Sequence, residues 1–500
     1  MSDFPNTAVG LPSQLQYVLP PSLPDECRSY SVSISPNGVT SVTGSSAIPV
    51  VYVANGANMP SYPFNSQQLC FDIPCGMNAD TFLDPRETML NFRMVLTSTG
   101  LAQGATPNAA QAFNLISSAA SWIENLTLVS NNQPLESIQN YNLLHAMLLN
   151  SSVSPSERLG GTAICMGTNE TFTTGVSLPI LGGVAGTQFF FNFCIPLVSI
   201  VGLNSQKLIP VGSIQSLQLQ ITTATTCPFA SYVTGTLAAT NVIGFAAPVL
   251  DGFSLNMKYV SVGSMAAQML KDTLVDNKWY IKSQTYVSSN STLPIATAGS
   301  VSQMYQIRNS SVKSLFIAHT TAPSAVCPNG QYDAINPNAT SCQLKLAGMS
   351  YPQKPLNPSQ RPAESFASFI GAFGGGSNFK DFGGAISRSG YGASLNQGVG
   401  YDTMMTLPAL GKRSLSSYDI LTATAFTTIV NYPNSHYTGF DLDRCTGSNL
   451  FSGQNTRSAP PYVELTISNA LPVSVQSFAF ALVDVVLAFE PAAKYVSVYN

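Results

Sequence analysis

The sequence SLQLQIT, residues 216–222, alternates apolar and polar side chains, and the same alternation returns 246 residues later as YVELTIS, residues 462–468. A period of two puts the apolar side chains of an extended segment on one face, so both segments are predicted to be half-buried β-strands. A second repeat follows each of them, because KYVSV occurs at residues 258–262 and again at residues 494–498.

The two repeats keep their order along the chain, and their offsets of 246 and 236 residues differ by ten. Solenoid units repeat about every 20 to 50 residues, so a repeat of this length corresponds to a whole domain. We therefore predict two consecutive copies of one β-domain, each closing with the same pair of strands. A chain of 500 residues is long enough for two such cores.

The composition is typical of an all-β protein with many turns, since the chain has 37 Gly, 33 Pro and, as 20 Tyr plus 26 Phe, 46 residues of these two aromatic types. Charged residues make up 9% of the chain, against about 25% in ordinary soluble domains. A surface with so few charges is weakly hydrated, and we expect much of it to be covered by copies of the chain or by other partners.

Four segments follow from these patterns. Residues 1–30 are Pro-rich and aperiodic and are predicted to be an extended N-terminal arm, whose apolar side chains we expect to order on a neighbouring subunit or another partner protein. Residues 31–265 are predicted to form the first β-domain, residues 266–278 a linker, and residues 279–500 the second β-domain.

A short helix is predicted at residues 264–274. Further strands are predicted at residues 68–73, 88–98, 122–130, 188–198, 253–262, 279–287, 311–319, 424–432 and 478–489.

One longer helix is predicted in the first domain, at residues 134–150. Its apolar stripe has helical spacing and consists of Ile138, Tyr141, Leu144 and Leu148. Pro134 suits the start of a helix, and the negative charge of Glu136 in the first turn would interact favourably with the helix dipole. In the second domain, residues 369–401 are rich in Gly and are predicted to form a long exposed loop within an irregular middle.

No catalytic, cofactor-binding or metal site is predicted. The segment GAFGGG, residues 371–376, lacks the Lys-Ser/Thr of a phosphate-binding loop. His145, His319 and His436 are scattered and lack metal-site spacing. Asp441 and Asp443 lie on one face of an extended segment, where a solvated strand edge is favoured over a pair of catalytic carboxylates.

The nine Cys include no CxxC pair, and we expect buried, reduced thiols. The N-terminus lacks the pattern of a secretory signal, and the most apolar run, residues 478–489, is too short for a transmembrane helix and contains Asp484. With a net charge of −3 and no basic run, the chain is not expected to bind nucleic acid directly.

Two β-domains of matching strand order, with the strand and helix of WIENLTLVSNNQPLESIQNYNLLHAMLLN (residues 122–150) in the first, resemble the double jelly-roll major capsid proteins, most closely those of virophages and polinton-like viruses. The resemblance implies an all-β fold of two tandem eight-stranded jelly rolls, with a short helix inserted in the first and long loops. It implies a structural, non-enzymatic protein whose homotrimers form pseudo-hexagonal blocks of an icosahedral shell. Its partners would be neighbouring capsomers, penton and minor capsid proteins, and its place the virion, after assembly inside the host cell.

Two other functions are weighed against this one. A secreted or surface β-sandwich lectin or adhesin would have a signal peptide and an even number of Cys, and the sequence has neither. A carbohydrate-active enzyme built on jelly rolls would depend on Asp441 and Asp443 alone.

Overall fold

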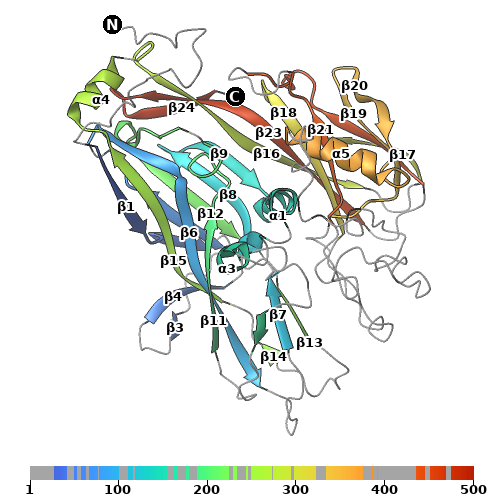
Figure 1. The fold of residues 1–500 in the computed structure, drawn as a ribbon, viewed down its shortest axis with the longest axis horizontal. Helices are drawn as coiled ribbons and strands as arrows, with labels where there is room; N and C mark the ends of the chain where they lie inside the picture. The colour runs from blue at the N-terminus through green and yellow to red at the C-terminus, as the bar shows by residue number, and fades with distance from the viewer. Residues whose placement is uncertain are drawn as a thin grey trace, which may run out of the picture.

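The computed structural model describes residues 27–41, 50–52, 58–63, 67–76, 78–100, 111–115, 119–154, 157, 161–166, 176–178, 188–205, 207–224, 229–233, 244–245, 249–272, 274–293, 298–321, 334–374, 384, 386, 391, 435–444, 451–468 and 474–499. Strands dominate it, and they form two sandwiches of antiparallel sheets that lie side by side (Figure 1). The expectation of an all-β chain with two jelly rolls is confirmed.

The first jelly roll packs one four-stranded layer on another. One layer has the order β11-β6-β15-β1, formed by Gln188–Pro196, Thr81–Gly100, Val249–Ser261 and Arg28–Ile34. The other has the order β9-β8-β12-β5, formed by Gln133–Gln139, Ile123–Ser130, Leu217–Thr223 and Gln67–Ile73. Shorter strands extend these layers or pair beside them: β2 (Gly38–Ser41), β3 (Val50–Tyr52), β4 (Asn58–Pro63), β7 (Gln111–Leu115), β10 (Val176–Leu178), β13 (Phe229–Val233) and β14 (Gly244–Phe245).

The second jelly roll repeats this arrangement. Its first layer has the order β21-β18-β23-β16, formed by Tyr437–Asp441, Val312–Thr321, Val475–Glu490 and Trp279–Leu293. Its second has the order β20-β19-β22-β17, formed by Met349–Leu356, Ala339–Leu346, Tyr462–Ile467 and Gly299–Met304. The alternating segments SLQLQIT and YVELTIS form β12 and β22, and these strands occupy the same place in the two sandwiches.

The two KYVSV segments do not occupy equivalent places, so the prediction of identical closing strands is wrong for this pair. The first copy ends β15, where Lys258–Ser261 pairs with β1 and with the first residues of β6. The second copy largely forms a separate strand, β24 (Tyr495–Tyr499), which folds back on Val486–Glu490 of β23. The reason lies in the neighbours: β6 has 20 residues and β18 only 10, so β24 pairs along the part of β23 that β18 is too short to reach.

The long helix of the first jelly roll begins later than predicted. Residues 133–139 are strand β9, and the helix is α1, Tyr141–Ser152. Asn131 and Asn132 both have positive φ, as the central residues of a two-residue hairpin turn require, so the chain reverses and β9 pairs with β8. Pro134 and Glu136 therefore lie in a strand, whereas Tyr141 and Leu144 are buried as expected and Leu148 is half-buried.

The second jelly roll also contains a helix that was not predicted from the sequence. Helix α5, Pro362–Ala372, follows β20 as α1 follows β9, and it packs on β21 and β18. The predicted loop at residues 369–401 thus begins inside a helix. Pro362 in the first turn and Glu364 beside it are helix-start signals that the Gly-rich sequence downstream obscured.

The other helices whose bounds the described residues give are short: α3 (Gly161–Met166), α4 (Ser264–Lys271), and the 3-10 turns at Ala119–Trp122 and Val211–Ser213. The linker helix is confirmed as α4, and the strands predicted elsewhere are confirmed with shifted ends, except residues 424–432. That segment, most of residues 369–401 and residues 1–26 lie outside the described residues. Residues 28–30, which the predicted arm included, form the start of β1.

Candidate functional site: the seam between the jelly rolls

The two jelly rolls meet along a seam in which β9 of the first lies beside β16 of the second (Figure 1). Glu136, on β9, is fully buried there. Its carboxylate accepts hydrogen bonds from the Ser199 hydroxyl and from the Ile200 amide at 3.0 Å, both in the first jelly roll. Its other oxygen accepts a hydrogen bond from the hydroxyl of Thr285, on β16, so one acidic side chain joins both sandwiches.

Burial raises the pKa of Glu136 above its ordinary value, because the charged form loses its hydration, while the three donors act in the opposite direction. Its neighbour Tyr141 has a raised pKa, chiefly through burial and partly through the carboxylate of Glu136. The Tyr141 hydroxyl accepts a hydrogen bond from the Val198 amide at 2.8 Å. These polar groups hold the start of α1 and the 198–200 segment against the seam.

Further hydrogen bonds join the two jelly rolls at other points along the seam. The Gln139 amide donates to the Ser288 hydroxyl at 3.1 Å, and the Ser283 hydroxyl donates to the Asn204 carbonyl at 3.2 Å. Near the C-terminus, the Gln215 amide donates to the carbonyl of Lys494 at 3.0 Å. The two sandwiches are therefore joined by a distributed polar contact surface as well as by the linker.

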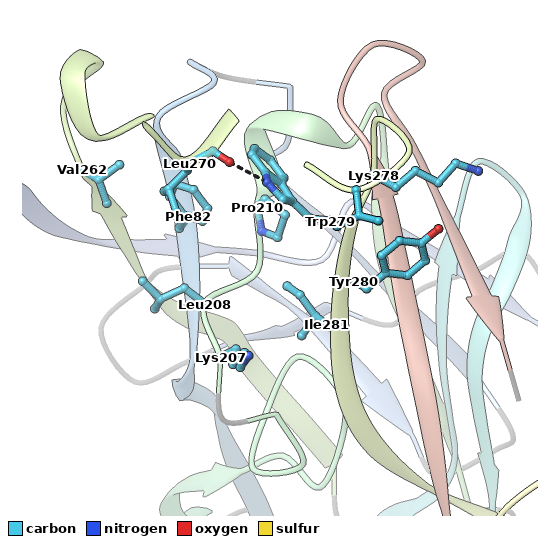
Figure 2. A pocket seen from close by; sticks show the side chains of 11 residues that line it. Phe82, Lys207, Leu208, Pro210, Val262, Leu270, Lys278, Trp279, Tyr280 and Ile281 are labelled. Atoms are coloured by element: carbon cyan, nitrogen blue, oxygen red, sulfur yellow. Dashed lines mark hydrogen bonds between the residues drawn. The ribbon is translucent and has the colours of Figure 1, made fainter. Parts of the chain in front are cut away.

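A pocket of about 450 Å³ lies at the linker end of this seam (Figure 2). Its lining is mostly apolar and comes from both jelly rolls and the linker: Phe82, Lys207, Leu208, Pro210, Val262, Leu270, Val275, Lys278, Trp279, Tyr280 and Ile281. The Trp279 indole N–H donates to the Leu270 carbonyl at 2.9 Å, and its ring lies 6.5 Å from that of Phe82, which fixes the aromatic wall. Lys278 pairs with Glu490 at 3.6 Å at the rim.

Apolar side chains are unusually exposed at and around this pocket. Val275 is 59% exposed and Tyr280 46%, and Met269, on the helix beside them, is 65% exposed. Exposed apolar groups that gather beside a pocket mark a surface that binds another chain or segment. Sequence reasoning missed this site, because its lining residues lie on four segments that only the tertiary fold brings together.

The two carboxylates weighed for catalysis, Asp441 and Asp443, lie at the end of β21 and just beyond it. Asp443 pairs with Lys313 at 3.3 Å, and the carboxylate of Asp441 accepts a hydrogen bond from the amide of Asp443 at 2.9 Å. Burial raises the pKa of Asp441. Asp441 is exposed at the end of β21, in line with the expected strand edge.

All three histidines are buried in the core. Burial lowers the pKa of His145 to about 4, of His319 to about 3 and of His436 to about 4. His145 is on α1 and His319 on β18, while His436 Nδ1 lies 2.9 Å from the Tyr391 carbonyl. They are therefore neutral core side chains near pH 7.

The described cysteines, at positions 27, 70, 75, 165, 194 and 342, form no disulfide with one another. The expectation of burial holds for Cys342 but is wrong for Cys165, which is exposed, and the others are half-buried. Burial raises the pKa of Cys75 and Cys342 to about 12, so both are protonated near pH 7. Within the described ranges, no three His, Cys, Asp or Glu side chains are grouped to hold a metal ion. No described helix is long and apolar enough to span a membrane.

Comparison with solved structures identifies the fold. The chain is similar to the capsid protein of the virus PBCV-1, with a TM-score of 0.53 and 10% identity over 98% of this chain and 100% of that one. It is also similar to the mavirus major capsid protein, with a TM-score of 0.53 and 10% identity over 98% of this chain and 93% of that one. The Faustovirus major capsid protein matches with a TM-score of 0.52 and 9% identity over 96% of this chain and 93% of that one. No protein-family model and no curated protein matches the sequence. The chain therefore has the double jelly-roll fold of these capsid proteins over nearly its full length.

Proposed function

We propose that this protein is a structural major capsid protein whose homotrimers are pseudo-hexagonal blocks of an icosahedral shell. The observation that carries the proposal is the repetition of one strand order in two sandwiches joined side by side by the Glu136 seam. Threefold symmetry applied to such a chain yields six nearly equivalent units around one axis. Trimers with such a hexagonal outline can cover a surface side by side, with one kind of chain as the building unit.

The domain organisation that fits this role has the first jelly roll at residues 28–265, because β1 begins at Arg28 and not at residue 31. The linker is residues 266–278, and the second jelly roll is residues 279–500, beginning with Trp279 on β16. A chain with 9% charged residues suits a subunit whose sides are buried against other subunits. Its partners would be two copies of itself, neighbouring capsomers, and penton and minor capsid proteins, all in the virion.

Light scattering coupled to size-exclusion chromatography tests the proposal on purified protein. A trimer has a mass of about 159 kDa, three times the 52.9 kDa of one chain. We expect this species at micromolar concentration without added ligand. A stable monomer that binds glycans would contradict the proposal and favour the lectin alternative.

A further inference from the structure

We propose that the pocket of Figure 2 binds the Pro-rich stretch VLPPSLP, residues 18–24, of the same chain's N-terminal arm. The sequence alone suggests a neighbouring subunit or a minor capsid protein as the partner of the arm. The pocket offers a closer surface, on the same protomer. This inference concerns the isolated chain and does not depend on whether it builds shells.

The connection point of the arm lies beside the pocket. Arg28, the first residue of β1, pairs with Ser261, and the next residue, Val262, lines the pocket. Neighbouring strands are about 5 Å apart, and an extended chain covers about 3.3 to 3.6 Å per residue. The four steps from Arg28 back to Pro24 span about 13 Å, enough to reach from the edge of β1 across β15 to the pocket.

The chemistry of the pocket suits a Pro-rich segment. Such segments adopt the extended polyproline helix and bind to grooves lined by aromatic rings, since little conformational entropy is lost on binding. Trp279 and Phe82 supply rings, and Pro210 and Leu208 supply further apolar surface. The stretch itself offers Val18 and Leu19 before its first proline and Leu23 within the PxxP spacing of residues 21–24.

Charge agrees with this pairing. Residues 1–26 contain no Lys or Arg, and Asp25 and Glu26 stand between the Pro-rich stretch and β1. The pocket carries Lys207 and Lys278, and α4 ends at Lys271. Lys278 is already paired with Glu490, so Lys207 and Lys271 are the cationic side chains that the acidic end of the arm would approach.

The tether favours the chain's own arm over that of another copy. A segment joined to its site by a few residues has an effective local concentration in the millimolar range. An arm from another subunit would compete only where assembly places it at the same rim.

Photo-crosslinking on the full-length protein tests the inference. We would introduce p-benzoylphenylalanine at Leu208, which lines the pocket and is 37% exposed, and use the same replacement at Leu203, 54% exposed on the same segment but outside the lining, as the control. The expected result is crosslinking from position 208 to residues 18–24 within one chain, unchanged by hundredfold dilution, and none to the arm from position 203. Crosslinks that join two chains, equal crosslinking from both positions, or no arm crosslink from position 208 would overturn the inference.

A second comparison uses substitutions in the arm. Leu23→Asp should reduce the crosslink from position 208 at least fivefold, because a carboxylate would enter the apolar pocket. Leu11→Asp, outside the proposed stretch, should leave it unchanged. Equal effects of the two substitutions would contradict binding through residues 18–24. The readout needs neither a trimer nor a shell, so its failure is distinguishable from failure of the capsid proposal.

Discussion

Replacing Glu136 with alanine is expected to lower the free energy of unfolding by about 3 kcal/mol or more. The substitution removes the acceptor of three buried donors, namely the Ser199 hydroxyl, the Ile200 amide and the Thr285 hydroxyl. A buried donor left without a partner costs about 1 to 3 kcal/mol. The lower end applies to each donor, because water can enter the space that the side chain vacates.

Glu136→Gln is the matched control. One oxygen of Glu136 accepts from Ser199 and Ile200, and the other accepts from Thr285. A glutamine carbonyl can replace the first oxygen, and its NH₂ group can donate to the Thr285 hydroxyl, which rotates to accept. The expected change is within about 1 kcal/mol, close to the value of one ordinary hydrogen bond.

The two variants also separate the effect of pH. Burial raises the pKa of Glu136, so the folded protein keeps this proton to a higher pH than the unfolded chain does. The stability of the wild type relative to Glu136→Gln should therefore fall as pH rises above about 4.5 and level off above the raised pKa. Comparison with the glutamine variant removes the contribution of the other titrating groups.

Urea unfolding followed by tryptophan fluorescence is the assay. Trp122 is buried in the first jelly roll and Trp279 begins the second, so the emission reports both sandwiches. The alanine variant should have a lower midpoint, whereas the glutamine variant should stay close to the wild type at pH 5. An alanine variant with the wild-type midpoint would refute the assignment of Glu136 as the polar anchor of the seam.

Three further outcomes are expected. Leu144→Asp should lower the melting temperature strongly, at a cost of about 3 to 5 kcal/mol, because it puts an unpaired charge at a fully buried position of α1, and an unchanged melting curve would contradict the packing of this helix. Lowering the pH from 6.5 to 4 should destabilise the protein through His145, His319 and His436, because burial lowers their pKa and the unfolded chain therefore takes up protons at a higher pH than the folded protein does. His145→Gln should make the melting temperature depend less on pH. Gly439→Ala should destabilise the protein, because the added Cβ would lie 2.8 Å from the Cα of Phe369. Gly371→Ala is the control, because its added Cβ would have no atom within 4 Å. Equal melting temperatures for the two variants would contradict the close contact of α5 with β21.

The repeated strands could be predicted because their signal is local. Period-two alternation in SLQLQIT and YVELTIS depends only on which side chains face the core, and β12 and β22 form as expected. KYVSV shows the limit of that reasoning. Identical residues end one strand and form most of another, because the length of the neighbouring strand, and not the local sequence, decides what they pair with.

The predicted helix at residues 134–150 was wrong at its start for a local reason. The apolar residues at 138, 141, 144 and 148 have helical spacing and favoured a helix that begins at residue 134. The pair Asn131-Asn132 just before them favours a hairpin turn, because Asn tolerates the positive φ that such a turn requires. The seam was beyond sequence reasoning altogether. Glu136 and Thr285 are 149 residues apart, and nothing near either residue indicates that the other is its partner.

Electron microscopy of the purified, unassembled protein would show directly whether three chains form one capsid block. We expect particles with threefold symmetry and a pseudo-hexagonal outline, in which three pairs of jelly rolls surround one axis and each pair is joined by the β9–β16 seam. Single pairs of jelly rolls, or particles with twofold symmetry, would contradict this expectation.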